Sequence, residues 1–296
     1  MVIHNSMNGL VIKSLGGFYY VKADDGTVYP TRARGVFRKQ HISPVVGDIV
    51  EISHIEDETA SLDEIHNRKN YIERPPVANV DKLFLVVSTD DPKPNLLLID
   101  KTIAVAEINK IEPVLVISKT DLTEYEELNS LYSGIGLTCI PVSKFSNEWI
   151  DTLKLNLRGC ISVFTGNSGV GKSTILNRLS PGLNLNTGET SKKLGRGKHT
   201  TRHVELFDLG SESFVIDTPG FSTFELERYN ITDENIIVNG FREFSEFSSD
   251  CRFTGCSHTC EKGCSVIEAV NDGKIAESRH NNFKTMYNEI KDLHKW

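Results

Sequence analysis

The chain has 296 residues, of which 39% are hydrophobic and 25% are charged, which is ordinary for a globular protein. This composition excludes a disordered, collagen-like or coiled-coil chain, and the length fits two or three domains. The net charge of −7 at pH 7 excludes nucleic-acid binding through overall charge, but not through a local basic patch. The sequence shows neither an apolar run of about 20 residues nor a secretory signal. We therefore expect a cytoplasmic protein, a monomer by default, that does not enter a membrane.

Residues 1–75 alternate apolar and polar side chains in short runs that glycine and aspartate interrupt. Residues 9–35 read as three strands joined by two turns, and residues 45–55 contain a further strand. Short strands at this spacing predict a small barrel, and the length fits the five-stranded oligonucleotide-binding (OB) type.

Four basic side chains gather in this first zone. They are Arg32, Arg34, Arg38 and Lys39. One interpretation is an RNA-binding edge that contacts phosphates, and the other is an ordinary solvated loop face.

The sequence pattern changes in residues 76–224, where short apolar strands alternate with helical stretches. Strands rich in Val, Leu and Ile are expected at 81–88, 113–118, 137–143, 160–166, 203–209 and 213–220. A helix is expected over 96–110. This alternation predicts a doubly wound α/β domain, and residues 73–81, with their two prolines, are expected to be the linker that precedes it.

The strongest motif lies in this α/β zone and matches G-x-x-x-x-G-K-[ST], between an expected strand and an expected helix. Its residues, with the next one, are Gly166, Asn167, Ser168, Gly169, Val170, Gly171, Lys172, Ser173 and Thr174. The glycines allow successive backbone N–H groups to surround phosphates, and the helix N-terminus adds its dipole. Lys172 is expected to reach the β- and γ-phosphates, and Ser173 to bind Mg²⁺.

A second phosphate element is expected at Asp217-Thr218-Pro219-Gly220, which follows an apolar strand. Asp217 suits a water-mediated contact with Mg²⁺, and Gly220 offers its N–H to the γ-phosphate. Without the phosphate loop, this tetrapeptide would be an ordinary turn.

We expect the protein to be specific for guanine nucleotides, because Ser118-Lys119-Thr120-Asp121 resembles the [NT]-K-x-D motif of GTPases. In that resemblance Asp121 accepts hydrogen bonds from guanine N1 and N2, and Ser118 replaces the usual Asn or Thr. Ser143 and Lys144 resemble the accompanying motif that contacts guanine O6. Both precede the phosphate loop, the reverse of the ordinary order, so we expect a circularly permuted domain.

The hydrolytic residues are expected in the glycine-rich segment 194–202, which suits a switch that γ-phosphate and Mg²⁺ order. Thr200 or Thr201 is a candidate Mg²⁺ ligand. Position 221, often a water-orienting Gln in GTPases, is Phe221 here. His199 is therefore the candidate for positioning the attacking water, with a plain exposed loop histidine as the alternative.

Residues 225–296 combine a metal-ligand pattern with helical spacing. Cys251, Cys256, His258 and Cys264 offer the Cys₃His set of a closed, structural zinc site. Cys260 leaves a four-cysteine set open. An amphipathic helix is expected from Phe283 to Leu293. The zone is too small and charged for a large core, a deficit that a metal would offset.

Taken together, the permuted motif order, the barrel, Gly-Arg-Gly-Lys-His-Thr-Thr and the cysteine pattern resemble the bacterial RsgA family, over nearly the full chain. The resemblance implies three domains, 1–75, 76–224 and 225–296. It also implies GTP hydrolysis stimulated by the small ribosomal subunit, contact with its rRNA, and late maturation of that subunit. In the family the histidine matching His199 acts in hydrolysis. The alternatives are a nucleotide-gated RNA-binding module with negligible turnover, an ATPase, and, least favoured, a zinc enzyme.

Overall fold

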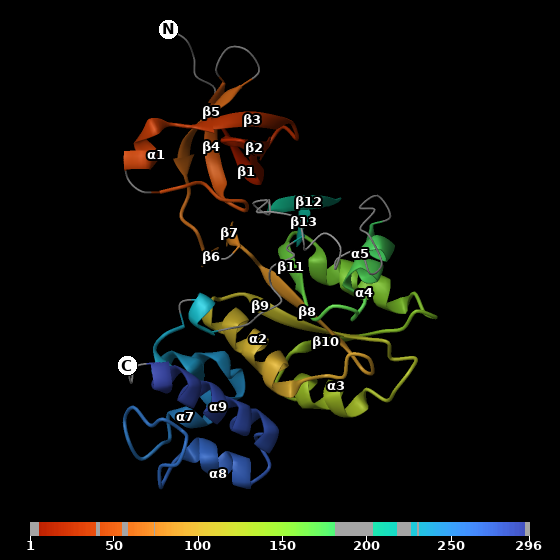
Figure 1. Ribbon diagram of the computed structural model, residues 1–296, viewed down its shortest axis with the longest axis vertical. Helices are drawn as coiled ribbons and strands as arrows, with labels where there is room; N and C mark the ends of the chain where they lie inside the picture. The colour runs from red at the N-terminus through yellow and green to blue at the C-terminus, as the bar shows by residue number, and fades with distance from the viewer. Residues whose placement is uncertain are drawn as a thin grey trace. The chain divides into compact units, whose positions relative to one another are not determined.

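Figure 1 shows the computed structural model of the chain. The structure describes residues 6–39, 42–54, 59–73, 75–180, 204–217, 226–229 and 231–293. The chain divides into two compact units. The first comprises Met1–Lys82, Leu153–Phe164 and Lys172–Phe221, and the second comprises Leu83–Thr152, Thr165–Gly171 and Ser222–Trp296.

The N-terminal part of the first unit is a closed five-stranded barrel, which confirms the predicted OB-type fold. Its elements are β1 (Ser6–Leu15), β2 (Phe18–Ala23), β3 (Val28–Ala33), α1 (Gly35–Lys39), β4 (Ile49–His54) and β5 (Ala60–Ile65). The strand order is β1-β2-β3-β5-β4, and β4 pairs back with β1 to close the barrel. Alternate side chains point inward and form a core that includes Val21, Ile52 and Leu62.

The segment expected to be a linker is instead an ordered hairpin. Strands β6 (Tyr71–Glu73) and β7 (Pro76–Ala78) pair antiparallel. Val77 is fully buried, and the side-chain amide of Asn79 donates to the carbonyl of Gly47 at 2.8 Å. The two prolines are tolerated because the hairpin is only two strands wide, which leaves edge positions without a partner strand.

The first unit also contains strands of the α/β domain. They are β11 (Ile161–Thr165), β12 (Glu205–Gly210) and β13 (Ser213–Asp217), with α5 (Lys172–Leu179). β13 runs parallel to β11 and antiparallel to β12, and β12 pairs with β1 of the barrel. Lys13 donates to Glu205 at 3.0 Å beside that pairing.

The second unit contains the sheet order β10-β9-β8 and the helices around it. The elements are β8 (Lys82–Ser88), α2 (Leu96–Ile108), β9 (Glu112–Ser118), α3 (Glu126–Ser133), β10 (Thr138–Val142) and the first half of α4 (Glu148–Leu157), which passes into the first unit at Leu153. β9 and β10 are parallel, and residues 114–118 of β9 are all buried, as in a strand covered on both faces.

The C-terminal part of this unit is helical, as predicted, and packs against α2 (Figure 1). Its elements are η2 (Leu226–Tyr229), η3 (Glu234–Gly240), η4 (Arg242–Phe244), α7 (Ser245–Ser248), α8 (Ser265–Asn271) and α9 (Glu277–Leu293). Phe241, Phe244 and Phe283 form a buried aromatic core with ring centroids 5.0–5.3 Å apart. The hydrophobic core of this zone is thus larger than its composition suggested. Leu293, which was expected on the buried face of the last helix, is 44% exposed.

Candidate functional site

The phosphate loop has the backbone that only glycine adopts easily. Gly166, Gly169 and Gly171 have φ values of 140°, 84° and 96°, and a Cβ on Gly166 would lie 2.1 Å from the carbonyl oxygen of Val86. This close approach explains why the first glycine of the motif is required. The loop therefore has the backbone freedom needed to turn N–H groups toward an anion.

The remaining residues of the phosphate loop differ in their exposure to solvent. Val170 is buried, Asn167 is half-buried and Ser168 is exposed. Lys172 begins α5, followed by a half-buried Ser173 and an exposed Thr174. Burial lowers the pKa of Lys172 below its ordinary value, because the charged form loses hydration.

Ser118 connects the candidate guanine motif to the phosphate loop. It is the last residue of β9 and is buried, and its Oγ lies 3.0 Å from the carbonyl oxygen of Val87 and 2.7 Å from that of Val170. Its single hydroxyl hydrogen is shared between two carbonyls from different segments. The short side chain thus contacts the protein itself, a role that the motif comparison did not reveal.

Asp121 and the loop after β10 lie together. The backbone N–H of Lys144 donates to Asp121 Oδ1 at 3.2 Å, and the Lys144 ammonium lies 3.8 Å from Oδ2. Partial removal from water acts to raise the pKa of Asp121, but the hydrogen bonds from Lys144 and Ser143 outweigh it and hold the pKa below its ordinary value. The carboxylate is therefore ionised and can only accept hydrogen bonds, as recognition of guanine N1 and N2 requires.

Lys119 and Thr120 form the turn between Ser118, at the end of β9, and Asp121. Lys119 adopts a left-handed φ of 58°, its carbonyl accepts from the hydroxyl of Thr89 at 2.8 Å, and its ammonium donates to the carbonyl of Asp91. The N–H of Thr120 donates to the carbonyl of Val142 at 3.3 Å. The structure therefore brings the segment 118–121 and the segment 143–144, which together make up the predicted base site, close to each other.

The candidate Mg²⁺ and hydrolytic residues are only partly within the described residues. Asp217 ends β13, and the parallel register Val163↔Ile216 places this strand end at the edge where β11 also ends. The side chain of Asp217 lies outside the described residues. So do His199, Thr200, Thr201 and Gly220.

The four candidate zinc ligands converge in the C-terminal zone. Their ligand atoms all lie within 4.8 Å of one another, in the set Cys251, Cys256, His258 and Cys264. His258 Nδ1 lies 3.3 Å from Cys264 Sγ and 3.6 Å from Cys251 Sγ, and these two sulfurs are 3.9 Å apart. Two sulfurs bound to one zinc at about 2.3 Å would be about 3.8 Å apart in a tetrahedron, so the donor set fits the ion.

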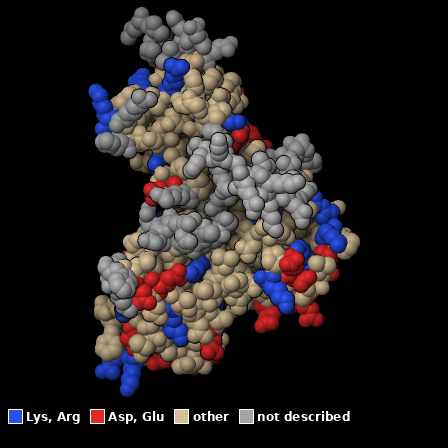
Figure 2. All heavy atoms as spheres, viewed as in Figure 1, with Lys and Arg blue, Asp and Glu red and all other residues tan. Residues whose placement is uncertain are grey.

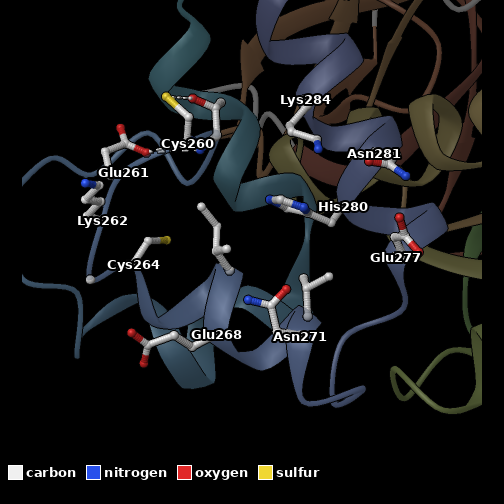
Figure 3. A pocket seen from close by; sticks show the side chains of 14 residues that line it. Cys260, Glu261, Lys262, Cys264, Glu268, Asn271, Glu277, His280, Asn281 and Lys284 are labelled. Carbon is white, nitrogen blue, oxygen red and sulfur yellow. Dashed lines mark hydrogen bonds between the residues drawn. The ribbon is translucent and has the colours of Figure 1, made fainter.

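Cys260 stands apart from that cluster. It is exposed, and the hydroxyl of Thr259 donates to its Sγ at 3.7 Å. Figure 3 shows Cys260 and Cys264 on the wall of a cavity of about 740 Å³. His280, on the same wall, lies 2.7 Å from the carbonyl of His258 through its Nε2. Such a contact fixes the backbone of a ligand residue, and the geometry favours the Cys₃His set over four cysteines.

The comparisons with known proteins agree with this geometry. A family model described as the RsgA GTPase matches residues 65–227, and one described as the RsgA N-terminal domain matches residues 8–62. The chain belongs to the RsgA GTPase family. A small ribosomal subunit biogenesis GTPase RsgA of Caldanaerobacter subterraneus subsp. tengcongensis is 44% identical over 98% of this chain and 97% of its own length. The corresponding protein of a Geobacillus species is 42% identical over 96% and 97%.

Solved structures of similar proteins share this fold over almost the whole chain. YloQ, described as a circularly permuted GTPase, superposes with a TM-score of 0.83 at 34% identity and covers 99% of this chain and 98% of its own. YjeQ from Thermotoga maritima gives a TM-score of 0.84 at 34% identity, covering 96% and 98%. These matches confirm the permuted GTPase fold expected from the order of the motifs. In the described part of this RsgA family member, no helix has the length and apolarity needed to cross a membrane.

The predicted basic cluster of this RsgA family member lies on the barrel surface around α1. Phe37 is buried in the barrel core and anchors α1, while Lys39 is exposed. Arg32 is exposed and stacks on Phe18, 4.6 Å from the ring centroid. Arg34 pairs with Asp63 at 2.8 Å, which offsets part of its charge. The side chain of Arg38 lies outside the described residues.

Figure 2 shows basic side chains over the α1 edge of the barrel. An arginine stacked on an aromatic ring, with the exposed Lys39 in the same cluster, is a combination that can bind phosphates and unpaired bases. This favours the RNA-binding interpretation of the cluster over a plain solvated face.

A buried ion-pair network joins α2 to the C-terminal helices, and sequence analysis missed it. Arg279 on α9 is fully buried and donates to Asp100 Oδ1 at 2.6 Å and to Glu243 Oε1 at 2.8 Å. Asp100 also accepts from the hydroxyl of Tyr132 at 2.8 Å and from the amide of Asn282 at 2.6 Å. Charged side chains are rarely buried unless they are paired, and here they tie the helical zone to the α/β domain.

Proposed function

We propose that this chain binds GTP with Mg²⁺ and hydrolyses it, and that the small ribosomal subunit stimulates hydrolysis during late maturation of that subunit. Membership of a family of GTPases supports the activity. The observation that supports the base specificity is the ionised Asp121 carboxylate, which lies beside the backbone N–H of Lys144 in the loop after β10. A chance S-K-x-D sequence in an ATPase would not require that arrangement.

In this proposal the nucleotide is held mainly by the backbone and by two charged side chains. Asp121 accepts from guanine N1 and N2, while the backbone of Ser143 and Lys144 donates to O6. The N–H groups of residues 166–171, with Thr174 after them, surround the phosphates. Lys172, partly withdrawn from water, contacts the β- and γ-phosphates more strongly than a fully hydrated ammonium would.

Mg²⁺ neutralises negative charge on the β- and γ-phosphates when bound. Ser173 and one of Thr200 and Thr201 are the proposed ligands, Asp217 contacts the ion through water, and Gly220 donates to the γ-phosphate. His199 positions the attacking water, because Phe221 has no group that can do so.

The proposed partner is the small ribosomal subunit with its rRNA. The barrel contacts RNA phosphates through the cluster that includes Arg32 and Lys39, with Arg34 and Arg38. The Cys₃His set holds a structural zinc with no open position for catalysis. Burial raises the pKa of the Cys256 thiol, and a bound cation would favour the thiolate form there.

The base assignment is tested with Asp121→Asn. An amide matches the carbonyl of xanthine at the position where guanine has an amino group. We expect the variant to bind xanthosine diphosphate more tightly than GDP, whereas the wild type prefers GDP. Asp272→Asn, on an exposed side chain far along the sequence, is the matched control. A variant that still prefers GDP would contradict the assignment.

A further inference from the structure

The loop that follows β10 presents an aromatic ring to solvent beside the base-reading residues. Phe145 comes directly after Ser143 and Lys144, and it is 79% exposed, more than any other large apolar side chain in the described ranges. Exposing a phenyl ring costs hydrophobic free energy. Beside a carboxylate proposed to read guanine, this exposed ring offers a flat apolar surface on which a base can stack.

The loop backbone that carries the ring is firmly held. The indole N–H of Trp149, which is buried, lies 3.1 Å from the carbonyl of Ser143 and 3.0 Å from that of Ser146. The N–H of Phe145 donates to Ser143 Oγ at 3.1 Å. The exposure of the ring is therefore set by the loop geometry, and a ligand would meet a preorganised surface.

The position of Lys144 shows how near the ring lies to Asp121. The Lys144 ammonium is 3.8 Å from Asp121 Oδ2 and 4.7 Å from the centroid of the Phe145 ring. The centroid is therefore no farther than about 8.5 Å from the carboxylate oxygen. A purine that hydrogen-bonds to this carboxylate at about 2.9 Å extends across a space of that size.

We propose that Phe145 is a wall of the nucleotide-binding site and stacks on the guanine base held by Asp121. The Lys144 ammonium lies beside Asp121 Oδ2, and the N1 and N2 donors of guanine take its place there. Stacking on an aromatic ring tolerates any base, so Phe145 contributes affinity while Asp121 contributes specificity. This inference rests on the proposed role of Asp121 in reading guanine.

The test is isothermal titration of GDP into the full chain carrying Phe145→Ala. Loss of one base–aromatic stack is expected to weaken binding about 5- to 150-fold, equally for GDP and GTP. Because the ring is exposed, the melting temperature of the free protein is expected to stay unchanged. Phe145→Trp is expected to retain affinity. Its added indole fluorescence is expected to change when GDP binds, measured against the wild type with its own Trp149 and Trp296.

The matched control is Phe253→Ala, which removes an exposed ring (52%) in the C-terminal zone and is expected to leave the Kd for GDP unchanged. An unchanged Kd for Phe145→Ala would overturn the inference. So would an unchanged Kd with weaker binding to small ribosomal subunits, since the ring would then contact the subunit. If Asp121→Asn shifts preference to xanthine while Phe145→Ala does nothing, only this inference fails. If Asp121→Asn shifts nothing, the proposed base site itself fails.

Discussion

Removing the hydroxyl of Ser118 is expected to weaken guanine nucleotide binding without touching the nucleotide. Ser118 Oγ lies 2.7 Å from the carbonyl oxygen of Val170 in the phosphate loop, and the side chain is only 4% exposed. In Ser118→Ala this carbonyl loses a buried donor. A lost buried hydrogen bond costs about 1–2 kcal/mol, which corresponds to about a 5- to 30-fold rise in Kd because the loop must be ordered to hold phosphates.

The assay is isothermal titration of GDP and of GTP into each variant. Ser118→Thr keeps the hydroxyl on a strand position that accepts a β-branched residue, so it is expected to bind like the wild type. Ser162→Ala is the matched control, because Ser162 is fully buried on β11 and its Oγ has no hydrogen-bond partner among the described residues. Removing the Ser162 hydroxyl is expected to leave the Kd for GDP and GTP unchanged and the free energy of unfolding unchanged or higher. If Ser118→Ala binds nucleotide as tightly as Ser162→Ala does, the connecting role of Ser118 is wrong.

Three further outcomes are expected. Arg279→Met leaves two buried carboxylates without their cation and should lower the free energy of unfolding, measured by urea denaturation, by about 3–5 kcal/mol. Lys274→Met removes one partner of an exposed pair and should cost less than about 1 kcal/mol. Equal losses in the two variants would refute the buried network. Cys264→Ser should abolish stoichiometric zinc in metal analysis and reduce helical circular dichroism, and a variant that retains one zinc per chain would contradict the Cys₃His site. Arg32→Ala with Lys39→Ala should reduce the slope of log K against log salt for small-subunit binding by about 1.5, and an unchanged slope would place the RNA contact elsewhere.

Sequence reasoning succeeded where chemistry depends on neighbouring residues. The phosphate loop was recognisable because its glycines, lysine and serine are contiguous and lie between a strand and a helix. The barrel was predictable because two-residue alternation and turn residues are local signals. The cysteine spacing likewise predicted a metal site, with Cys260 left as an alternative ligand, and the structure brings Cys251, Cys256, His258 and Cys264 together.

The missed features all depend on contacts between distant residues. Arg279 and Asp100 are 179 positions apart, and no periodicity predicts that a charged residue on a polar-looking helix is buried. Residues 73–81 looked like a linker because prolines mark breaks, yet Val77 is buried and forms a β-bridge with the distant Val46. The motif comparison treated Ser118 as a weakened base contact, whereas its hydroxyl contacts Val170 in the phosphate loop.

The central claim is a GTPase activity that the small ribosomal subunit stimulates. The most direct test measures phosphate release from GTP and from ATP, with and without purified small subunits, for the wild type and for His199→Ala. We expect release to rise strongly only with GTP and small subunits, and the histidine variant to lose that rise while still binding GDP. GTP binding with no stimulation by the subunit, or equal turnover of ATP, would contradict the account.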